Sequence, residues 1–240
     1  MNKRCKYAFF VCILLSIFFV ACGDSSSAND SAESEYDSAT NTLKDLRDGH
    51  VYRTVKIGGY IWMAENLNFK AAGSFCYNDD EKKCAEYGRL YTWASAMDSV
   101  GAFSAEGEGC GNGTVCNSRD IVRGVCPKGW FLPSIHVWAS LVNTLGGRYE
   151  AGKALKSASD WEDRNGTDEY SFSVLPVGVK RYDGLYVSEG KSASFWTSSQ
   201  NDEEYASSVD FSSNYSYVYD DLQHKYYGYS VRCISFVKAN

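Results

Sequence analysis

The sequence predicts an α+β domain held together by disulfides, and three observations lead to this prediction. Helical periodicity is concentrated between residues 89 and 157, whereas strand-length runs separated by turn residues dominate after Trp161. Six of the nine cysteines lie between residues 76 and 233. Helices that precede a set of antiparallel strands are typical of the α+β class.

A β-hairpin and a helix are predicted at the start of this domain. Two apolar-rich runs, 51–57 and 60–63, are separated by Gly58-Gly59, and this pattern is typical of a hairpin. A helix is predicted over 89–97, because four apolar side chains recur there on one helical face. This helix should face the core.

A second helix is predicted after Pro133, with Ser134 as its N-cap. Apolar residues recur with helical spacing over 137–145, and Gly146-Gly147 gives a stop signal. A shorter helix is predicted over 151–157. Two tryptophans of this region are candidates for core packing: Trp130 and Trp138.

The second half of the chain predicts strands joined by turns. Five segments have strand length: 172–181, which Pro176 interrupts, 194–198, 206–211, 215–219 and 229–234. No internal repeat is evident. We therefore expect two to three helices packed with antiparallel sheets.

The first 21 residues have the features of an export signal. Three basic residues precede the apolar run 7–20, which is shorter than a typical membrane-spanning helix. The stretch 19–22, Phe-Val-Ala-Cys, resembles the lipobox of bacterial lipoproteins. The resemblance implies that Cys22 is lipidated and anchors the protein to a membrane, which we expect to be the outer membrane of the cell envelope. Phe19 departs from the usual Leu, so an ordinary signal peptide with an incidental cysteine is the alternative.

Residues 22–48 are predicted to be an acidic, disordered tether, and the globular domain is predicted over 49–240. Ser, Ala, Asn, Asp and Glu dominate residues 24–48, which hold seven acids and two bases. Such a composition buries too little apolar surface to offset the entropy of ordering. Without the three basic residues of the signal, 21 Lys and Arg face 30 Asp and Glu, a net charge of −9. Nucleic acid is therefore excluded as a partner.

The cysteine count predicts three disulfides. Six cysteines remain after the signal and Cys22 are set aside, and an even number is typical of an exported chain with disulfides. The two short spacings indicate local bridges, which leaves the last two cysteines for a long one. The predicted pairs are Cys76–Cys84, Cys110–Cys116 and Cys126–Cys233. A zinc site is the alternative, but the chain has no CxxC motif and only three His, so no metal is predicted.

Several short motifs occur in an order that resembles a known family. They are Val55–Gly58, Trp62–Asn68, Gly88–Trp93, Cys126–Ser134, Phe195–Ser199 and Ser230–Cys233. Together they resemble the Fibrobacter succinogenes major paralogous domain, a module of bacterial surface lipoproteins. That family is similar in turn to the C-type lectin-like fold, which formylglycine-generating enzymes also use. The resemblance implies that the N- and C-terminal parts of the domain meet, in agreement with the Cys126–Cys233 pair.

An enzyme on the formylglycine-generating scaffold is the main catalytic alternative. Those enzymes use closely spaced cysteines before the final strand, whereas residues 200–232 contain no cysteine. Histidines at 50, 136 and 224 are scattered, and the acid pairs 203–204 and 220–221 are typical of solvated turns. We therefore expect no enzymatic activity and no cofactor. Calcium binding at the acidic stretch 78–81 stays open, although its ligand spacing is not that of a known loop.

A tyrosine-rich face is the candidate binding site. Seven of the 18 tyrosines lie between residues 205 and 229. Alternation of Tyr215, Tyr217 and Tyr219 on a strand would point all three to one face, and Tyr227 is a fourth candidate. Tyrosine offers a large contact area with a polar tip at low entropic cost. We expect a surface module that binds a polysaccharide or a surface protein; the alternatives are rings that only cover the sheet and a purely structural envelope protein.

Overall fold

The computed structural model describes residues 33–116 and 121–237, which belong to one compact unit. The predicted signal peptide and the predicted lipidation site, Cys22, lie outside these residues. Within them, no helix is long and apolar enough to cross a membrane.

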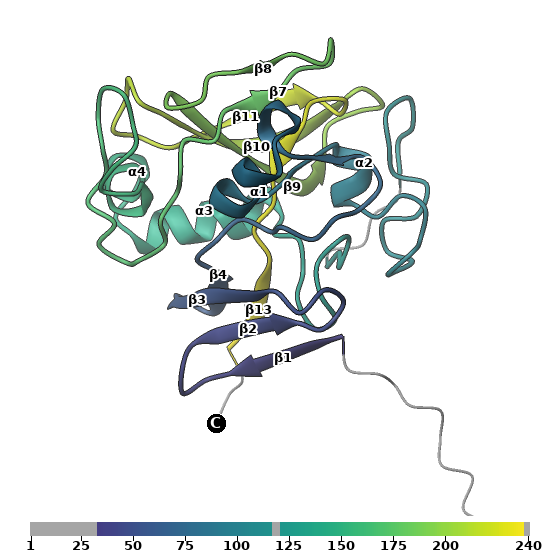
Figure 1. Cartoon of the computed structure of the whole chain (residues 1–240), viewed down its shortest axis with the longest axis horizontal. Helices are drawn as coiled ribbons and strands as arrows, with labels where there is room; N and C mark the ends of the chain where they lie inside the picture. Colours follow the sequence, from purple (N-terminus) through teal and green to yellow (C-terminus); the bar gives the residue numbers. More distant parts are fainter. Residues whose placement is uncertain (1–32, 117–120, 238–240) are drawn as a thin grey trace, which may run out of the picture. The chain divides into compact units, whose positions relative to one another are not determined.

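Two mainly antiparallel sheets lie at opposite ends of this unit, with helices between and beside them (Figure 1). The lower sheet has the strand order β1-β2-β3-β4-β13. Its strands are β1 (Ser34–Asp37), β2 (Thr42–Asp45), β3 (Val51–Ile57), β4 (Tyr60–Met63) and β13 (Ile234–Phe236). The β3–β4 turn contains Gly58 at φ +61°, a conformation that glycine adopts without strain, so the predicted hairpin forms.

The upper sheet has the order β11-β10-β9-β12-β6-β5 and is antiparallel except where β12 pairs with β9. Its strands are β5 (Ser74–Phe75), β6 (Leu90–Tyr91), β9 (Ser192–Gln200), β10 (Tyr205–Ser212), β11 (Tyr219–His224) and β12 (Tyr229–Ser230). A small hairpin of β7 (Val179–Lys180) and β8 (Tyr186–Val187) lies above it.

The described residues contain four α-helices and one 3₁₀ turn. They are α1 (Glu81–Tyr87), α2 (Trp93–Ala96), α3 (Ile135–Thr144), α4 (Arg148–Leu155) and the 3₁₀ turn Tyr77–Asp79. Ser134 caps α3 as predicted, because its side chain accepts a hydrogen bond from the amide of Val137. The fold is therefore α+β, with few helices and antiparallel sheets.

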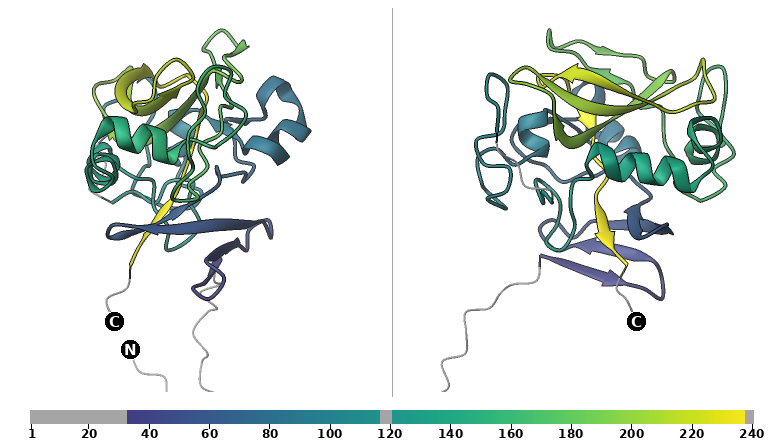
Figure 2. Two further views of the ribbon diagram at one scale, coloured as in Figure 1. Left: turned by 90° about the vertical axis from the view of Figure 1, so that its left-hand side faces the viewer. Right: turned by 180° about the vertical axis from the view of Figure 1, so that it is seen from behind.

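The ends of the described chain meet in the lower sheet. After β12 the chain runs down from the upper sheet, and β13 pairs with β4 so that Ile234 faces Trp62 and Phe236 faces Tyr60 (Figures 1 and 2). The resemblance implied this arrangement. The structure holds the three predicted disulfides: Cys76–Cys84, Cys110–Cys116 and Cys126–Cys233.

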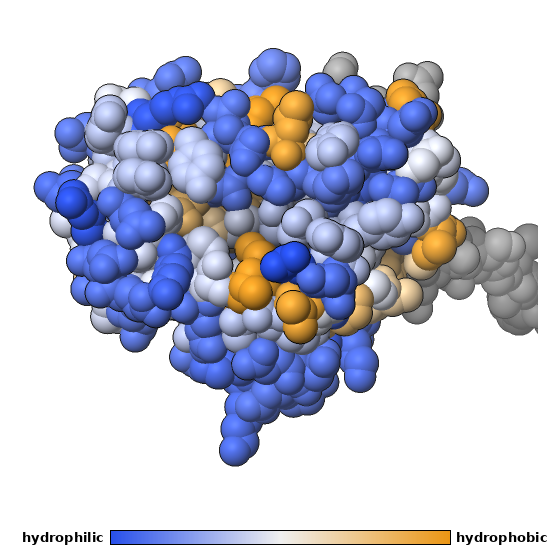
Figure 3. All heavy atoms as spheres, turned by 90° about the horizontal axis from the view of Figure 1, so that it is seen from above, coloured by the Kyte–Doolittle hydropathy of each residue, from blue (hydrophilic) through white to orange (hydrophobic). Residues whose placement is uncertain are grey.

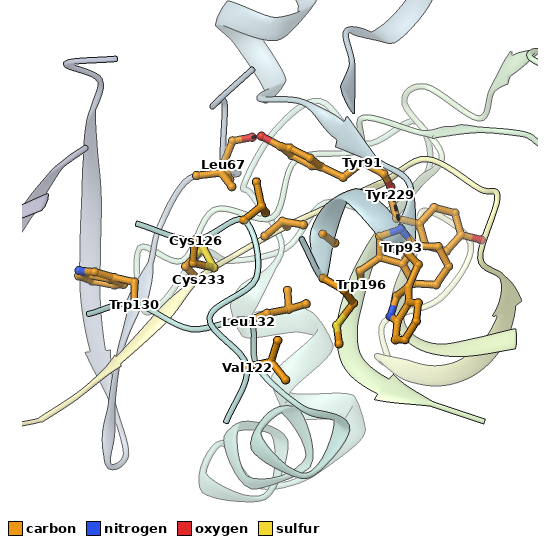
Figure 4. Close-up of a cluster of buried hydrophobic side chains, with 14 of the residues drawn as sticks. Leu67, Tyr91, Trp93, Val122, Cys126, Trp130, Leu132, Trp196, Tyr229 and Cys233 are labelled. Carbon is orange, nitrogen blue, oxygen red and sulfur yellow. Dashed lines mark hydrogen bonds between the residues drawn. A yellow bond between two sulfur atoms is a disulfide. The ribbon is translucent and has the colours of Figure 1, made fainter. Parts of the chain in front are cut away.

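Two large buried clusters form the core. The first surrounds the Cys126–Cys233 disulfide and includes Trp130 and Trp196 (Figure 4). The second lies between α3 and the upper sheet and contains Trp138, whose ring centroid is 4.8 Å from that of Trp62. Trp130 and Trp138 are both buried, as the sequence predicted.

The predicted tether is wrong for its described part. Residues 34–45 are not disordered but form β1 and β2, and β2 pairs with β3. Leu43 is fully buried in the first cluster, and Asp45 is fully buried in an ion pair with Arg47 at 2.7 Å. The globular domain therefore includes β1 and β2, which precede the predicted start at residue 49.

Several predicted elements also differ from the structure; the strand expected over 229–234 is divided between β12 and β13, which belong to different sheets. The helix expected over 89–97 is divided into β6 and the short α2, because Leu90 and Tyr91 pair with β12 and β5. The strand expected over 172–181 is limited to β7. Residues 215–218 form no strand, and β11 begins only at Tyr219.

Candidate functional site

Three of the four predicted tyrosines lie together at the start of β11. Tyr217 is the central ring: its centroid lies 5.0 Å from that of Tyr215, in a stacked arrangement, and 6.0 Å from that of Tyr219. Tyr149 in the first turn of α4 joins them, 5.4 Å from Tyr217. We call these four residues the tyrosine cluster. Tyr227 lies apart from them and packs against Tyr182 and Tyr229.

The rings of the tyrosine cluster are accessible to a ligand. Tyr149 is 68% exposed and Tyr215 47% exposed, whereas Tyr217 and Tyr219 are half-buried. Seen from above, the molecule presents a mostly hydrophilic face on which hydrophobic side chains form only small, separate groups (Figure 3). Recognition by the tyrosine cluster would depend on amphipathic rings with polar hydroxyl groups.

The segment that carries Tyr215 and Tyr217 is held by α4 and by a buried lysine. Gly152 permits the close approach, since a Cβ there would lie 2.3 Å from the carbonyl oxygen of Ser216. The Nζ of Lys156 donates to the carbonyl oxygen of Ser212 at 2.9 Å and to that of Tyr215 at 3.4 Å. Burial, with a smaller contribution from nearby Arg164, lowers the pKa of Lys156 to about 8. The strand prediction failed here because these contacts replace ladder pairing.

A groove of about 410 Å³ adjoins the tyrosine cluster between α3 and β11. We call it the α3–β11 groove; its lining includes Trp138, Val142, Arg148, Val218, Tyr219 and Asp220. Arg148 and Asp220 form an exposed ion pair at its edge. The Nε1 of Trp138 is buried and has no hydrogen-bond partner among the described residues. Aromatic, apolar and a few polar groups thus meet in one concave surface, as in typical ligand sites.

Sequence reasoning missed a buried acid, Asp210, which lies directly opposite Tyr219 in the pairing of β10 with β11. Asp210 on β10 is 5% exposed and accepts hydrogen bonds from the hydroxyls of Ser194 and Ser208. The pKa of the Asp210 carboxyl is raised to about 6, mainly by burial and to a lesser extent by Asp221 and Asp220, against the lowering effect of the two hydroxyls. Asp210 lies among serines in the sequence of β10, and this polar pattern did not indicate that its side chain is buried.

The raised pKa of Asp210 predicts a pH dependence of stability. Between pH 4 and 6 the folded protein holds a proton on Asp210 that the unfolded chain has released, so the free energy of unfolding falls as pH rises through this window. A shift from 3.8 to about 6 corresponds to a loss of about 3 kcal/mol. Denaturant unfolding at pH 4, 5, 6 and 7 measures it, with Asp210→Asn as the matched variant. The difference between the free energies of unfolding of the two proteins should change across this pH window. A constant difference would contradict the raised pKa of Asp210.

The described residues contain one group of three side chains that could in principle bind a metal ion, but its chemistry does not support a metal site. Cys76, Glu81 and Cys84 place their ligand atoms within 4.8 Å of one another. Both sulfurs, however, are bonded to each other in a disulfide and cannot act as thiolate ligands. Asp79, in the acidic stretch left open for calcium, instead accepts a hydrogen bond from the Tyr186 hydroxyl at 2.6 Å.

Comparison with known proteins identifies the domain. The sequence profile of the Fibrobacter succinogenes major domain matches residues 55–235, or 181 of the 240 residues. The chain belongs to this family. The Fibrobacter succinogenes major domain therefore includes the upper sheet, the tyrosine cluster and the α3–β11 groove, whereas β1 and β2 precede the matched region. No curated protein and no solved structure matches the chain.

Proposed function

We propose that this protein is a non-catalytic surface module that binds a glycan through the tyrosine cluster and the α3–β11 groove. The exposed rings around Tyr217 carry the proposal. Sugar rings present C–H faces that stack on aromatic side chains and hydroxyls that need planar polar partners. Arg148 and Asp220 offer such partners beside Tyr219, because all three line the groove.

The oxidised cysteines favour a non-catalytic role over an enzyme on the formylglycine-generating scaffold. All six cysteines of the described residues are in disulfides, so no thiol is left there as a nucleophile. We further propose a C-type lectin-like arrangement, which is supported by the pairing of β13 with β4 and by the disulfide that joins Cys126 to Cys233. An experimental structure whose strand order differs from that fold would overturn this assignment.

Loss of the tyrosine cluster should abolish ligand capture without unfolding the protein. The triple variant Tyr215→Ala, Tyr217→Ala and Tyr219→Ala removes the stacking surface, and polysaccharide retention measures the result. The full-length protein is first screened against plant cell-wall polysaccharides and envelope extracts. Tyr170→Ala is the control, since Tyr170 is 39% exposed and lies outside the cluster.

Retention by the wild type and the control but not by the triple variant is the expected result, with thermal unfolding as the check on folding. Capture of an envelope protein instead of a polysaccharide would replace the glycan by a protein ligand at the same surface. Unchanged capture by a folded triple variant would contradict the site, and no capture at all would favour a purely structural envelope protein.

We also propose that a lipid on Cys22 holds this module at the outer membrane. Cys22→Ser should release the protein from the membrane fraction, because the acyl chains supply the anchor. Cell fractionation and detergent-phase partition measure the change. Cys12→Ser is a matched control, since that cysteine would leave with the signal peptide. Membrane retention of Cys22→Ser would support an anchor other than this cysteine.

A further inference from the structure

A second pocket lies at the other end of β11. It has a volume of about 350 Å³ and is lined by Asn112, Tyr182, Glu204, His224 and Tyr226, a set that we call the Tyr226 pocket. The six residues of β11 separate it from the tyrosine cluster by about 17 Å. Tyr182 is 64% exposed and Tyr226 is 59% exposed, so both rings are accessible at its rim.

The walls of the Tyr226 pocket are fixed by the buried ammonium group of Lys225. The residue is 1% exposed, and its Nζ lies 4.5 Å from the ring centroid of Trp93. Four oxygens surround this Nζ: the carbonyls of Gly111 at 3.2 Å, Thr114 at 2.9 Å and Asp202 at 2.7 Å, and the side-chain oxygen of Gln200 at 3.1 Å.

Contacts of Lys225 hold two residues that line the pocket, Asn112 and Glu204. Asn112 lies between two of the loop residues that Lys225 binds, and the Cys110–Cys116 disulfide closes that loop. The amide of Lys225 donates to the carbonyl oxygen of Glu204 at 2.9 Å. The ring of His224 is held against Tyr205 at 4.2 Å. The pocket is therefore largely formed before any ligand arrives.

The groups that face the Tyr226 pocket are acceptors and π faces. The Oδ1 of Asn112 is buried and has no hydrogen-bond donor among the described residues. Glu204 is exposed and forms no ion pair with a described residue, and Asp202 and Glu203 add negative charge beside it. A buried acceptor without a donor costs free energy that a donating ligand restores.

Among the described residues, Lys225 and Arg181 are cations near the pocket, but neither fills it. The ammonium group of Lys225 donates hydrogen bonds to backbone carbonyl oxygens beneath the walls of the pocket. The guanidinium of Arg181 lies 5.8 Å from the ring centroid of Tyr182 and is paired with Asp183 at 3.0 Å.

We propose that the Tyr226 pocket binds an alkylammonium group, either a primary amine or a methylated one. Tyrosine faces attract such cations and the carboxylate of Glu204 neutralises their charge; a primary amine also brings an N–H for the oxygen of Asn112, which a quaternary ammonium lacks. An anion is disfavoured because the carboxylates would repel it. This site is independent of the glycan site and goes beyond the proposed function.

Calorimetric titration of the full-length protein with choline tests the proposal. Its neutral isostere, 3,3-dimethylbutan-1-ol, is the matched control ligand and should bind at least about fivefold more weakly, because it has the same shape without the charge. Nα-acetyl-lysine N-methylamide and glucosamine distinguish a protein source of the amine from an amino sugar. Tighter binding of either one supports the site and identifies the source.

Variants locate the binding. Tyr226→Ala and Glu204→Gln should each weaken the binding of choline about two- to fivefold, and both residues are exposed enough to be replaced without unfolding the protein. Tyr217→Ala should leave choline binding unchanged, so a failure of the glycan site would not affect this result. Equal binding of the neutral isostere, no binding of any ammonium probe, or unchanged binding in Glu204→Gln would overturn the proposal.

Discussion

Replacing Cys126 and Cys233 with alanine is expected to lower the free energy of unfolding by about 4–5 kcal/mol. The two cysteines are 107 residues apart in sequence, and closing so long a loop removes much of the entropy of the unfolded chain. Both are fully buried in the first core cluster, where the bridge joins the segment before α3 to the segment before β13 (Figure 4).

Guanidinium unfolding of the double variant measures this effect, and the Cys110–Cys116 pair supplies the comparison. That pair is separated by six residues and is expected to contribute about 2–3 kcal/mol when it is replaced in the same way. The long bridge should therefore have the larger effect. Equal losses for the two double variants would contradict the loop-entropy account.

Trp138→Ala is expected to lower the free energy of unfolding by about 3–5 kcal/mol, because it leaves a large cavity. Trp138 is 1% exposed, and its ring lies 4.8 Å from that of Trp62 and 5.4 Å from that of Phe195. It also forms part of the floor of the α3–β11 groove, so the same change should disturb ligand binding.

Chemical denaturation with intact disulfides measures the loss, and Tyr149→Ala is the control. Tyr149 is an aromatic residue on the neighbouring helix α4 but is 68% exposed, so its replacement should change stability by no more than about 0.5 kcal/mol. A loss below about 1 kcal/mol for Trp138→Ala would show that the second core cluster packs around other residues.

Local signals explain why several elements could be predicted from the sequence. Ser134 and Gly146 mark the two ends of α3 through capping chemistry that acts within a few residues. The β3–β4 hairpin follows from Gly58 between two apolar runs. The cysteine pairs followed from an even count and two short spacings, and they required no knowledge of the sheets.

Tertiary pairing explains what the sequence concealed at the N-terminal side. Residues 34–45 have the composition of a solvated tether, but β2 gains ladder hydrogen bonds from β3. Only Leu43 offers an apolar side chain to the core there, and Asp45 is buried because Arg47 neutralises it. Composition alone cannot reveal a strand whose stability comes from its partner.

The candidate site was predicted only in part, because tertiary contacts also determine which tyrosines meet there. Tyr215, Tyr217 and Tyr219 do lie together, but the strand alternation that predicted this does not occur, because the segment is held by α4 and Lys156 and is not a strand. Tyr149 could not be found from the same pattern, since it lies 66 residues before Tyr215 and reaches the cluster only through the fold.

The affinity of Tyr217→Ala for the polysaccharide that the wild-type protein retains tests the proposed glycan site most directly. Tyr217 contacts the other three rings of the tyrosine cluster, so its loss should weaken binding at least about fivefold while the protein stays folded. Tyr217→Phe, which keeps the ring, should retain most of the affinity, and Tyr170→Ala should retain all of it. Equal affinities of Tyr217→Ala and the wild type, or retention of no polysaccharide by the wild type, would contradict the site.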